Sequence, residues 1–268
     1  LESRQRPQAY KFSAPMGIPP LDEAREGGLH EGEMGFIMGS TGLGKSHFCV
    51  HFGAQHILTG GKVLHLSLEM PASSIAARYD RAITGYDKWE IRENYDRARA
   101  VLTTKVDLAD LDIRFYPRGS LTLSGVHRII KEAKDHWQET PLVILDYFSL
   151  LKKTGDEKSY AQINALAEGL SGIIQEEQVA LWSPFQMNRE GYKKRRDGEE
   201  RGDLGDAGGS YDATTHAEYI LSLNQSPEDK LKNRMHVQVT KERNNMYASA
   251  SVLADWSRSR VVFERNTA

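Results

Sequence analysis

Eight residues near the start of the chain have the pattern of a phosphate-binding loop. Residues 39–46 read GSTGLGKS and match G-x-x-x-x-G-K-[ST] at every fixed position. The backbone N–H groups of such a loop turn inward onto phosphate oxygens, which Gly42 and Gly44 allow because they lack a side chain. Lys45 would then reach the β- and γ-phosphates of a nucleoside triphosphate, and the Ser46 hydroxyl would bind Mg²⁺. We expect the nucleotide to be contacted by Gly39, Ser40, Thr41, Gly42, Leu43, Gly44, Lys45, Ser46 and His47.

Three polar residues follow apolar runs, where the remaining groups of such a site are expected. Asp146 closes the run LVILD and is the expected acid of the magnesium shell. Glu69 follows the alternating run KVLHLSL and is the candidate group that orients or deprotonates water. Gln186 follows another apolar run and is the candidate sensor of the γ-phosphate. Because ligands of parallel sheets bind beyond the carboxyl ends of the strands, we expect these residues to meet the phosphate loop at one edge.

The elements that must position these residues alternate between strand and helix. We expect strands at residues 34–38, 62–68, 113–116, 142–146 and 179–184, and helices at 45–58, 71–85, 87–103, 123–137 and 161–174. A polar segment at 188–212, expected to be a long loop, precedes four further strands at 217–223, 236–241, 248–253 and 260–263. The order predicts one α/β domain, residues 21–268, with a mostly parallel central sheet flanked by helices and an antiparallel β extension at the C-terminal end. Residues 1–20 contain four prolines and are expected to be a linker or arm.

Composition narrows the class of protein. Hydrophobic residues make up 39% of the 268 and charged residues 27%, as in globular proteins, and no apolar stretch is long enough to span a membrane. The single cysteine, Cys49, excludes an intrachain disulfide and fits a reducing cytoplasm. The first residue is Leu1 rather than Met, so we expect a piece of a longer polypeptide.

Nucleic acid, if bound, must meet a local patch, because the formal net charge of −2 excludes a strongly basic surface. Two loops are candidates. The first, 152–160, carries Lys152 and Lys153, and the second, 188–212, carries a KKRR run among acids. The second loop also contains glycines, whose backbone N–H groups can face phosphates.

Taken together, these residues resemble the motor domain of hexameric, DnaB-type replicative DNA helicases of bacteria and phages. The resemblance spans residues 17–263 and includes GIPPLDEAREGGLHEG at 17–32, the phosphate loop, SLEM at 67–70, the Asp-Tyr pair at 146–147, FQMNR at 185–189 and KERN at 241–244. It implies a RecA-like P-loop core that hydrolyses ATP with Mg²⁺, with Glu69 as catalytic base. It also implies that Lys241 and Arg243 reach into the neighbouring subunit's site.

The resemblance further implies a homo-oligomeric ring, a hexamer in the full-length protein, that moves on single-stranded DNA and has a primase and a helicase loader as possible partners. By position in the family, DNA contacts are expected first at residues 203–210, although Gly205 and Asp206 replace the family's Arg-Glu pair. The residues concerned there are Asp203, Leu204, Gly205, Asp206, Gly208 and Gly209. Two alternatives share this core: a RecA- or RadA-like recombination ATPase that builds open filaments, and an ATP-gated assembly or loading module.

Overall fold

The computed structural model of the chain describes residues 11–153, 159–186, 211–242 and 248–264. Its strands are β1 (Ser13–Ala14), β2 (Leu29–His30), β3 (Met34–Gly39), β4 (Val63–Ser67), β5 (Leu111–Phe115), β6 (Leu142–Asp146), β7 (Ala180–Gln186), β8 (Tyr219–Asn224), β9 (Arg234–Glu242), β10 (Ser249–Asp255) and β11 (Arg260–Phe263). Its α-helices are α1 (Pro19–Ala24), α2 (Lys45–Leu58), α3 (Ala72–Thr84), α4 (Lys88–Glu93), α5 (Tyr95–Lys105), α6 (Leu123–Trp137), α7 (Ser159–Glu177), α9 (Tyr211–Thr215) and α10 (Pro227–Leu231). Two 3₁₀ helices are η1 (Leu108–Asp110) and η2 (Phe148–Leu150).

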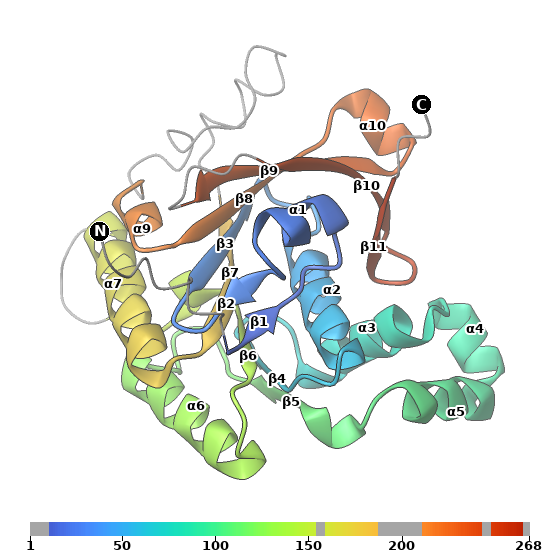
Figure 1. The fold of residues 1–268 in the computed structure, drawn as a ribbon, viewed down its shortest axis with the longest axis horizontal. Helices are drawn as coiled ribbons and strands as arrows, with labels where there is room; N and C mark the ends of the chain where they lie inside the picture. The colour runs from blue at the N-terminus through green and yellow to red at the C-terminus, as the bar shows by residue number, and fades with distance from the viewer. Residues whose placement is uncertain (1–10, 154–158, 187–210, 243–247, 265–268) are drawn as a thin grey trace, which may run out of the picture.

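Nine strands form one continuous sheet in the order β11-β10-β9-β8-β3-β7-β6-β4-β5 (Figure 1). The strands from β8 to β5 in this order pair in parallel, and β8 pairs antiparallel with β9. Strands β10 and β11 continue the antiparallel part. The parallel sheet with an antiparallel C-terminal extension is therefore confirmed.

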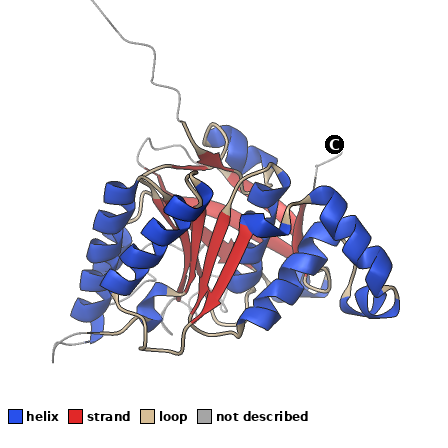
Figure 2. Ribbon diagram, turned by 90° about the horizontal axis from the view of Figure 1, so that it is seen from below, coloured by secondary structure: helices blue, strands red, loops and turns tan. Residues whose placement is uncertain are grey.

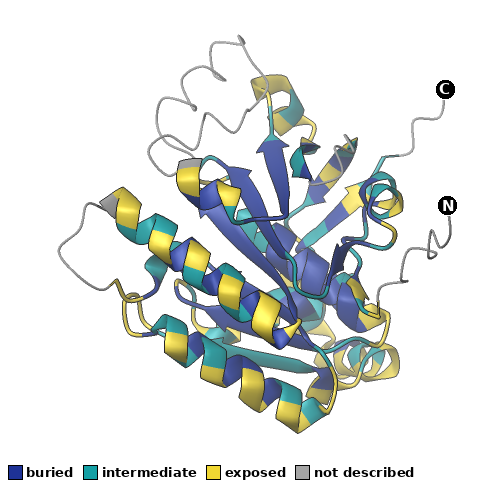
Figure 3. Cartoon of the chain, turned by 60° about the vertical axis from the view of Figure 1, so that its left-hand side comes forward, coloured by how far each residue is buried: buried dark blue, intermediate teal, exposed yellow. Residues whose placement is uncertain are grey.

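The central strands are apolar because helices cover both faces of the sheet (Figures 2 and 3). All five residues of β6 are buried, and alternate ones belong to different cores. Ile144 packs into the cluster that contains α2 and α3, whereas Leu145 packs into the cluster that contains α6 and α7. A near-continuous apolar run is the expected sequence of such a doubly covered strand.

The start of the domain differs from the expected linker. In the described part of residues 1–20, the side chains of Ala14, Met16 and Ile18 are fully buried in the core. Asp22 holds this segment in place, because its carboxylate accepts hydrogen bonds from the backbone N–H groups of Met16 and Ile18. The prolines do not prevent the alternate apolar side chains of this segment from packing, and Pro19 and Pro20 open helix α1.

The helix expected at 87–103 is two helices, α4 and α5, which project at one end of the molecule (Figure 1). Asp87 and Glu90 form a capping box that starts α4, and the chain turns at Asn94, whose φ of −132° and ψ of 56° are not helical. Only Ala98 is buried on these two helices, so little apolar packing favours one continuous helix.

A buried ion-pair cluster joins the first helix to the antiparallel strands. The Arg25 guanidinium, which is 5% exposed, donates a hydrogen bond of 2.6 Å to Glu242 at the end of β9. It also pairs with Glu33, and this contact contributes to lowering the pKa of Glu33 to about 2 against the cost of burial. No helix among the described residues is long and apolar enough to cross a membrane.

Candidate functional site

The phosphate loop connects the central strand β3 to helix α2. Strand β3 ends at Gly39 and α2 begins at Lys45, so the loop opens directly onto the positive end of a helix of 14 residues. Gly42 and Gly44 have φ values of +84° and +81°, which side chains disfavour. The Lys45 ammonium donates to the carbonyl oxygens of Gly39 and Ser40 at 2.8 and 2.9 Å. The loop is thus folded around its own lysine, and no side chain caps the helix start that would face an anion.

A pocket of about 560 Å³ lies over this loop. It collects the expected groups from four separate strand ends in the middle of the sheet. Its lining residues are Thr41, Gly42, Gly44, Lys45, Ser46, His47, Glu69, Met70, Arg78, Asp146, Tyr147, Pro184 and Gln186. The prediction that the polar residues meet at one sheet edge is correct because the strands pair in register there: Gly39 lies opposite Gln186, and Ser67 opposite Asp146.

Asp146 is fully buried, and neither of its carboxylate oxygens has a hydrogen-bond partner of good geometry. Burial raises its pKa to about 6, while contact with Ser46 and the nearby Lys45 oppose the rise. A carboxylate left without donors beside a hydroxyl is a donor set for a hard cation, and the residues therefore fit Mg²⁺. Ser46 and Asp146 are the residues that would hold it.

Lys45 is the cation at the bottom of the pocket. Burial lowers its pKa to about 8, and the negative charges of Asp146 and Glu69 oppose the shift. A triphosphate adds further negative charge beside the ammonium, so binding would raise this pKa again and keep the lysine protonated.

Glu69 and Gln186 lie on opposite sides of the pocket. The Glu69 carboxylate accepts a hydrogen bond of 2.5 Å from Arg118, in the turn that follows β5. The Gln186 amide donates to the hydroxyl of Thr41 in the phosphate loop. Both side chains are thus within reach of a nucleotide held by the loop, one from strand β4 and one from strand β7.

Sequence reasoning missed Arg78, which lies on α3 and also lines the pocket. One of its guanidinium nitrogens is buried without a hydrogen-bond partner, and burial lowers its pKa against the opposing charge of Asp146. An unpartnered cation facing the phosphate loop is suited to a phosphate oxygen. Its only sequence signal was its position in the helix that follows Glu69. A single sequence does not distinguish an arginine in that position from a surface arginine.

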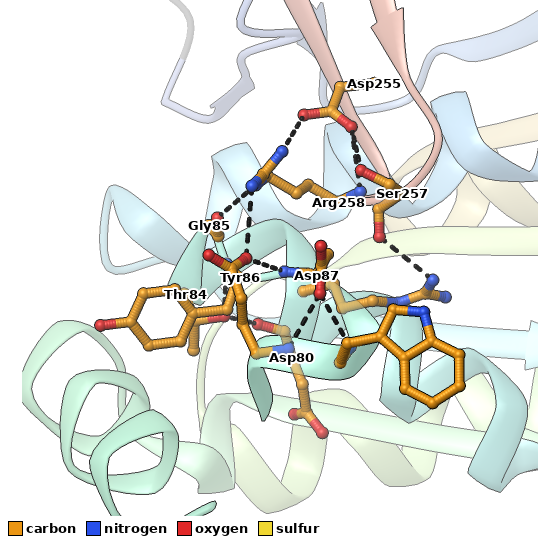
Figure 4. Close-up of polar contacts among 11 residues, drawn as sticks. Asp80, Thr84, Gly85, Tyr86, Asp87, Asp255, Ser257 and Arg258 are labelled. Atoms are coloured by element: carbon orange, nitrogen blue, oxygen red, sulfur yellow. Dashed lines mark hydrogen bonds and ion pairs between the residues drawn. The ribbon is translucent and has the colours of Figure 1, made fainter. Parts of the chain in front are cut away.

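Trp256 was also missed, because it reaches the phosphate loop from the turn between β10 and β11. Its ring packs against His47 with centroids 5.0 Å apart, and a Cβ atom on Gly44 would lie 2.6 Å from it. Figure 4 shows how this turn is held at the end of α3 and on α4: Arg258 donates to the carbonyl oxygen of Gly85 at 2.9 Å and pairs with Glu90 of α4 at 3.3 Å. The far end of the sheet therefore closes one side of the loop.

The remaining predicted residues fall into three groups. The Lys241 ammonium donates to the carbonyl oxygens of Thr214 and Thr215 on α9 at 2.9 and 2.8 Å, away from the pocket of its own chain. Lys152 and Lys153 are exposed after η2. Outside the described residues lie Arg243, Asp203, Leu204, Gly205, Asp206, Gly208 and Gly209.

Comparison with known proteins identifies relatives of this site. The model of the family "DnaB-like helicase C terminal domain" matches residues 14–263. A DnaB-like replicative helicase of Enterobacteria phage T4 is 24% identical over 189 residues, which are 66% of this chain and 40% of that protein. The chain thus spans less than half the length of this relative.

Two solved structures share the fold with a TM-score of 0.81 each. One is an ATPase domain that is 17% identical, and the match covers 96% of this chain and 93% of that chain. The other is a DnaB-like replicative helicase described with its interactions with primase. It is 18% identical, and the match covers 95% of this chain and 62% of that chain. The RecA-like arrangement expected from the sequence is therefore present.

Proposed function

Because this chain belongs to the family of DnaB-like helicase C-terminal domains, we propose that it is an ATP-hydrolysing motor that moves along single-stranded DNA. One observation carries the proposal. The phosphate loop, Asp146, Glu69 and Gln186 line one pocket, although they come from four strands spread over the sequence. That is the set of groups that phosphoryl transfer to water requires.

Binding is the task of the phosphate loop. The N–H groups around Gly42 and Gly44 and the start of α2 take the phosphates, and Lys45 exchanges the carbonyl oxygens of Gly39 and Ser40 for phosphate oxygens. Arg78 adds a second cation from α3. Ser46 and Asp146 would hold Mg²⁺, which would supply neutralisation of the negative charge on the phosphates.

Hydrolysis needs a base near the γ-phosphate, and the position of Glu69 in the pocket lining supports that role. Its carboxylate takes one proton from water as the water oxygen bonds to the γ-phosphorus, and the bond to the β–γ bridging oxygen breaks to release ADP. Gln186, held by Thr41, is positioned to report whether the γ-phosphate is present.

Assembly would complete the site. Lys241 and Arg243 are proposed to act on the nucleotide of the neighbouring subunit, since a cation supplied in trans stabilises the transferred phosphoryl group. Lys241 points to α9 instead of its own pocket, which supports a role outside that pocket. We therefore propose a ring, hexameric in the full-length protein, with Lys152, Lys153 and residues 203–210 along the DNA path and with primase and a loader as partners.

Family membership argues against the two alternatives considered from the sequence, a recombination ATPase and an ATP-gated loading module. The presence of Glu69 in the pocket argues further against a module that binds without turnover.

The test is ATP turnover by the full-length protein with and without single-stranded DNA. We expect stimulation by DNA and loss of nucleotide binding in Lys45→Ala. Lys131→Ala is the matched control, because Lys131 is an exposed lysine on α6, remote from the pocket. Equal turnover by wild type and Lys45→Ala, or no response to DNA, contradicts the proposal.

A further inference from the structure

The carboxylate that must accept the proton of water is already engaged by a cation. Arg118 pairs with Glu69 at 2.5 Å, and among the described residues neither side chain has a second hydrogen-bond or ion-pair partner that competes for this contact. Both side chains are solvent-accessible, 59% for Arg118 and 40% for Glu69, so the pair can open without unfolding the site. Glu69 lines the nucleotide pocket, whereas Arg118 lies outside its lining.

The turn that carries Arg118 is bound on two sides. On one side, the N–H of Tyr116 donates to the carbonyl oxygen of Ser67, two residues before Glu69. On the other side, the N–H of Gly119 donates to the carbonyl oxygen of Leu150 at 2.8 Å. The turn is thus a bridge between the strand end that holds the base and the end of η2.

On its second side, this turn is hydrogen-bonded to the segment that carries the candidate nucleic-acid contact, Lys152 and Lys153. The N–H of Lys152 donates to the carbonyl oxygen of Leu121 at 2.7 Å, at the other end of the same turn. The side chains of Lys152 and Lys153 are exposed, and two adjacent ammonium groups suit the phosphates of a single strand. Movement of this backbone on binding phosphates would be transmitted to the turn through these hydrogen bonds.

We propose that Arg118 is a positioning residue that withholds Glu69 from the attacking water until single-stranded DNA binds at Lys152 and Lys153. The inference rests on the proposed ATPase function and adds its control by DNA. The Glu69 carboxylate has one oxygen occupied by the Arg118 guanidinium, and that oxygen is not available to orient or bind water. Opening of the pair frees Glu69 to orient water, so DNA binding raises turnover without changing the nucleotide contacts.

The experiment measures ATP turnover of the full-length protein with and without oligo-dT. Arg118→Ala is expected to raise the DNA-free kcat about two- to five-fold, the range set by the strength of an exposed ion pair, and to lower the stimulation ratio by the same factor. KM for ATP stays unchanged, since Arg118 does not line the pocket. Arg118→Lys keeps the cation and is expected to stay near wild type.

Two further variants separate the proposed control from other effects. Arg128→Ala is the matched control, because Arg128 is an exposed arginine that pairs with Glu132 on α6, and it leaves both rates unchanged. The double change Lys152→Ala and Lys153→Ala removes DNA stimulation when it is made in the wild type. When it is made together with Arg118→Ala, the raised DNA-free rate remains.

The outcomes are distinguishable. A DNA-stimulated wild type whose DNA-free kcat is unchanged or lowered by Arg118→Ala overturns the inference and leaves the proposed function standing. A wild type that binds ATP without hydrolysing it in any condition overturns both.

Discussion

Acidification is a direct test of the core around α2, because three histidines are buried there in their neutral form. His51 and His65 are fully enclosed, and His56 is nearly so. Burial lowers the pKa to about 4 for His51, about 4 for His56 and about 3 for His65, from 6.5. Each has at least one buried ring nitrogen without a hydrogen-bond partner, so an added proton on that nitrogen would have no acceptor.

The sign of the change in the free energy of unfolding depends on whether the folded or the unfolded state binds more protons. Above the unfolded pKa of 6.5, the histidines are neutral in both states and have no effect on stability. Below it, the unfolded chain binds protons that the folded chain excludes, and at about pH 5 each histidine lowers the free energy of unfolding by about 2 kcal/mol, about 6 kcal/mol in all. Asp146, whose pKa is raised to about 6, acts in the opposite direction and returns about 1 kcal/mol.

The loss that these three histidines and Asp146 contribute together, about 5 kcal/mol between about pH 7.5 and about pH 5, is comparable with the whole stability of many domains. For a chain of 268 residues it corresponds to a fall in Tm of about 9 °C. Urea unfolding at a series of pH values measures the slope of this free energy against pH. At about pH 5.5 these four groups contribute uptake of about two protons, because nearly one proton per histidine is partly offset by the proton that Asp146 releases.

A variant assigns the effect to the core. His65→Gln should reduce the proton uptake by about one, whereas His136→Gln, at an exposed position on α6, should leave it unchanged. A free energy of unfolding that stays flat over this pH range would refute the reasoning, because it would mean that the buried rings accept protons in the folded state.

Three other changes probe the site and its supports. Glu69→Gln should lower kcat by about 10²- to 10⁴-fold with little change in nucleotide Kd, as measured by turnover and calorimetry. Gly44→Ala should weaken nucleotide binding, because its Cβ would lie 2.6 Å from Trp256 at a φ of +81°; Gly60→Ala has a similar φ of +86° and open space, so thermal melts should show only a small loss and unchanged binding. Arg25→Ala removes the buried guanidinium from Glu33 and Glu242 and should cost about 3–5 kcal/mol in chemical denaturation; a loss below about 1 kcal/mol would contradict the buried ion pair.

Much of the site was predictable because it depends on strand ends. In a parallel sheet, an acid that closes an apolar run is placed by the strand, and Asp146 and Glu69 follow this rule in register. The order of helices and strands was predictable for the same reason, since LVILD is apolar at every position before its acid.

The contacts that could not be predicted join segments far apart in the sequence. Arg118 meets Glu69 across 49 residues, and Arg25 meets Glu242 across 217. Trp256 reaches Gly44 only because β10 and β11 curl back to α3, a geometry set by Arg258 rather than by any local pattern. The buried Met16 and Ile18 were hidden by the prolines around them, which signal backbone shape but not burial.

The position of β3 in the sheet has a mechanical consequence. β3 is hydrogen-bonded to β8, and β8 to β9, which ends beside Lys241. Only β8 thus separates β9 from the strand that precedes the phosphate loop, and the pairing of β8 with β9 is irregular between Ile220 and Leu221, beside Lys241. A force that an adjacent molecule exerted on the end of β9 would act first on this irregular pairing and would reach β3 through the hydrogen bonds of β8.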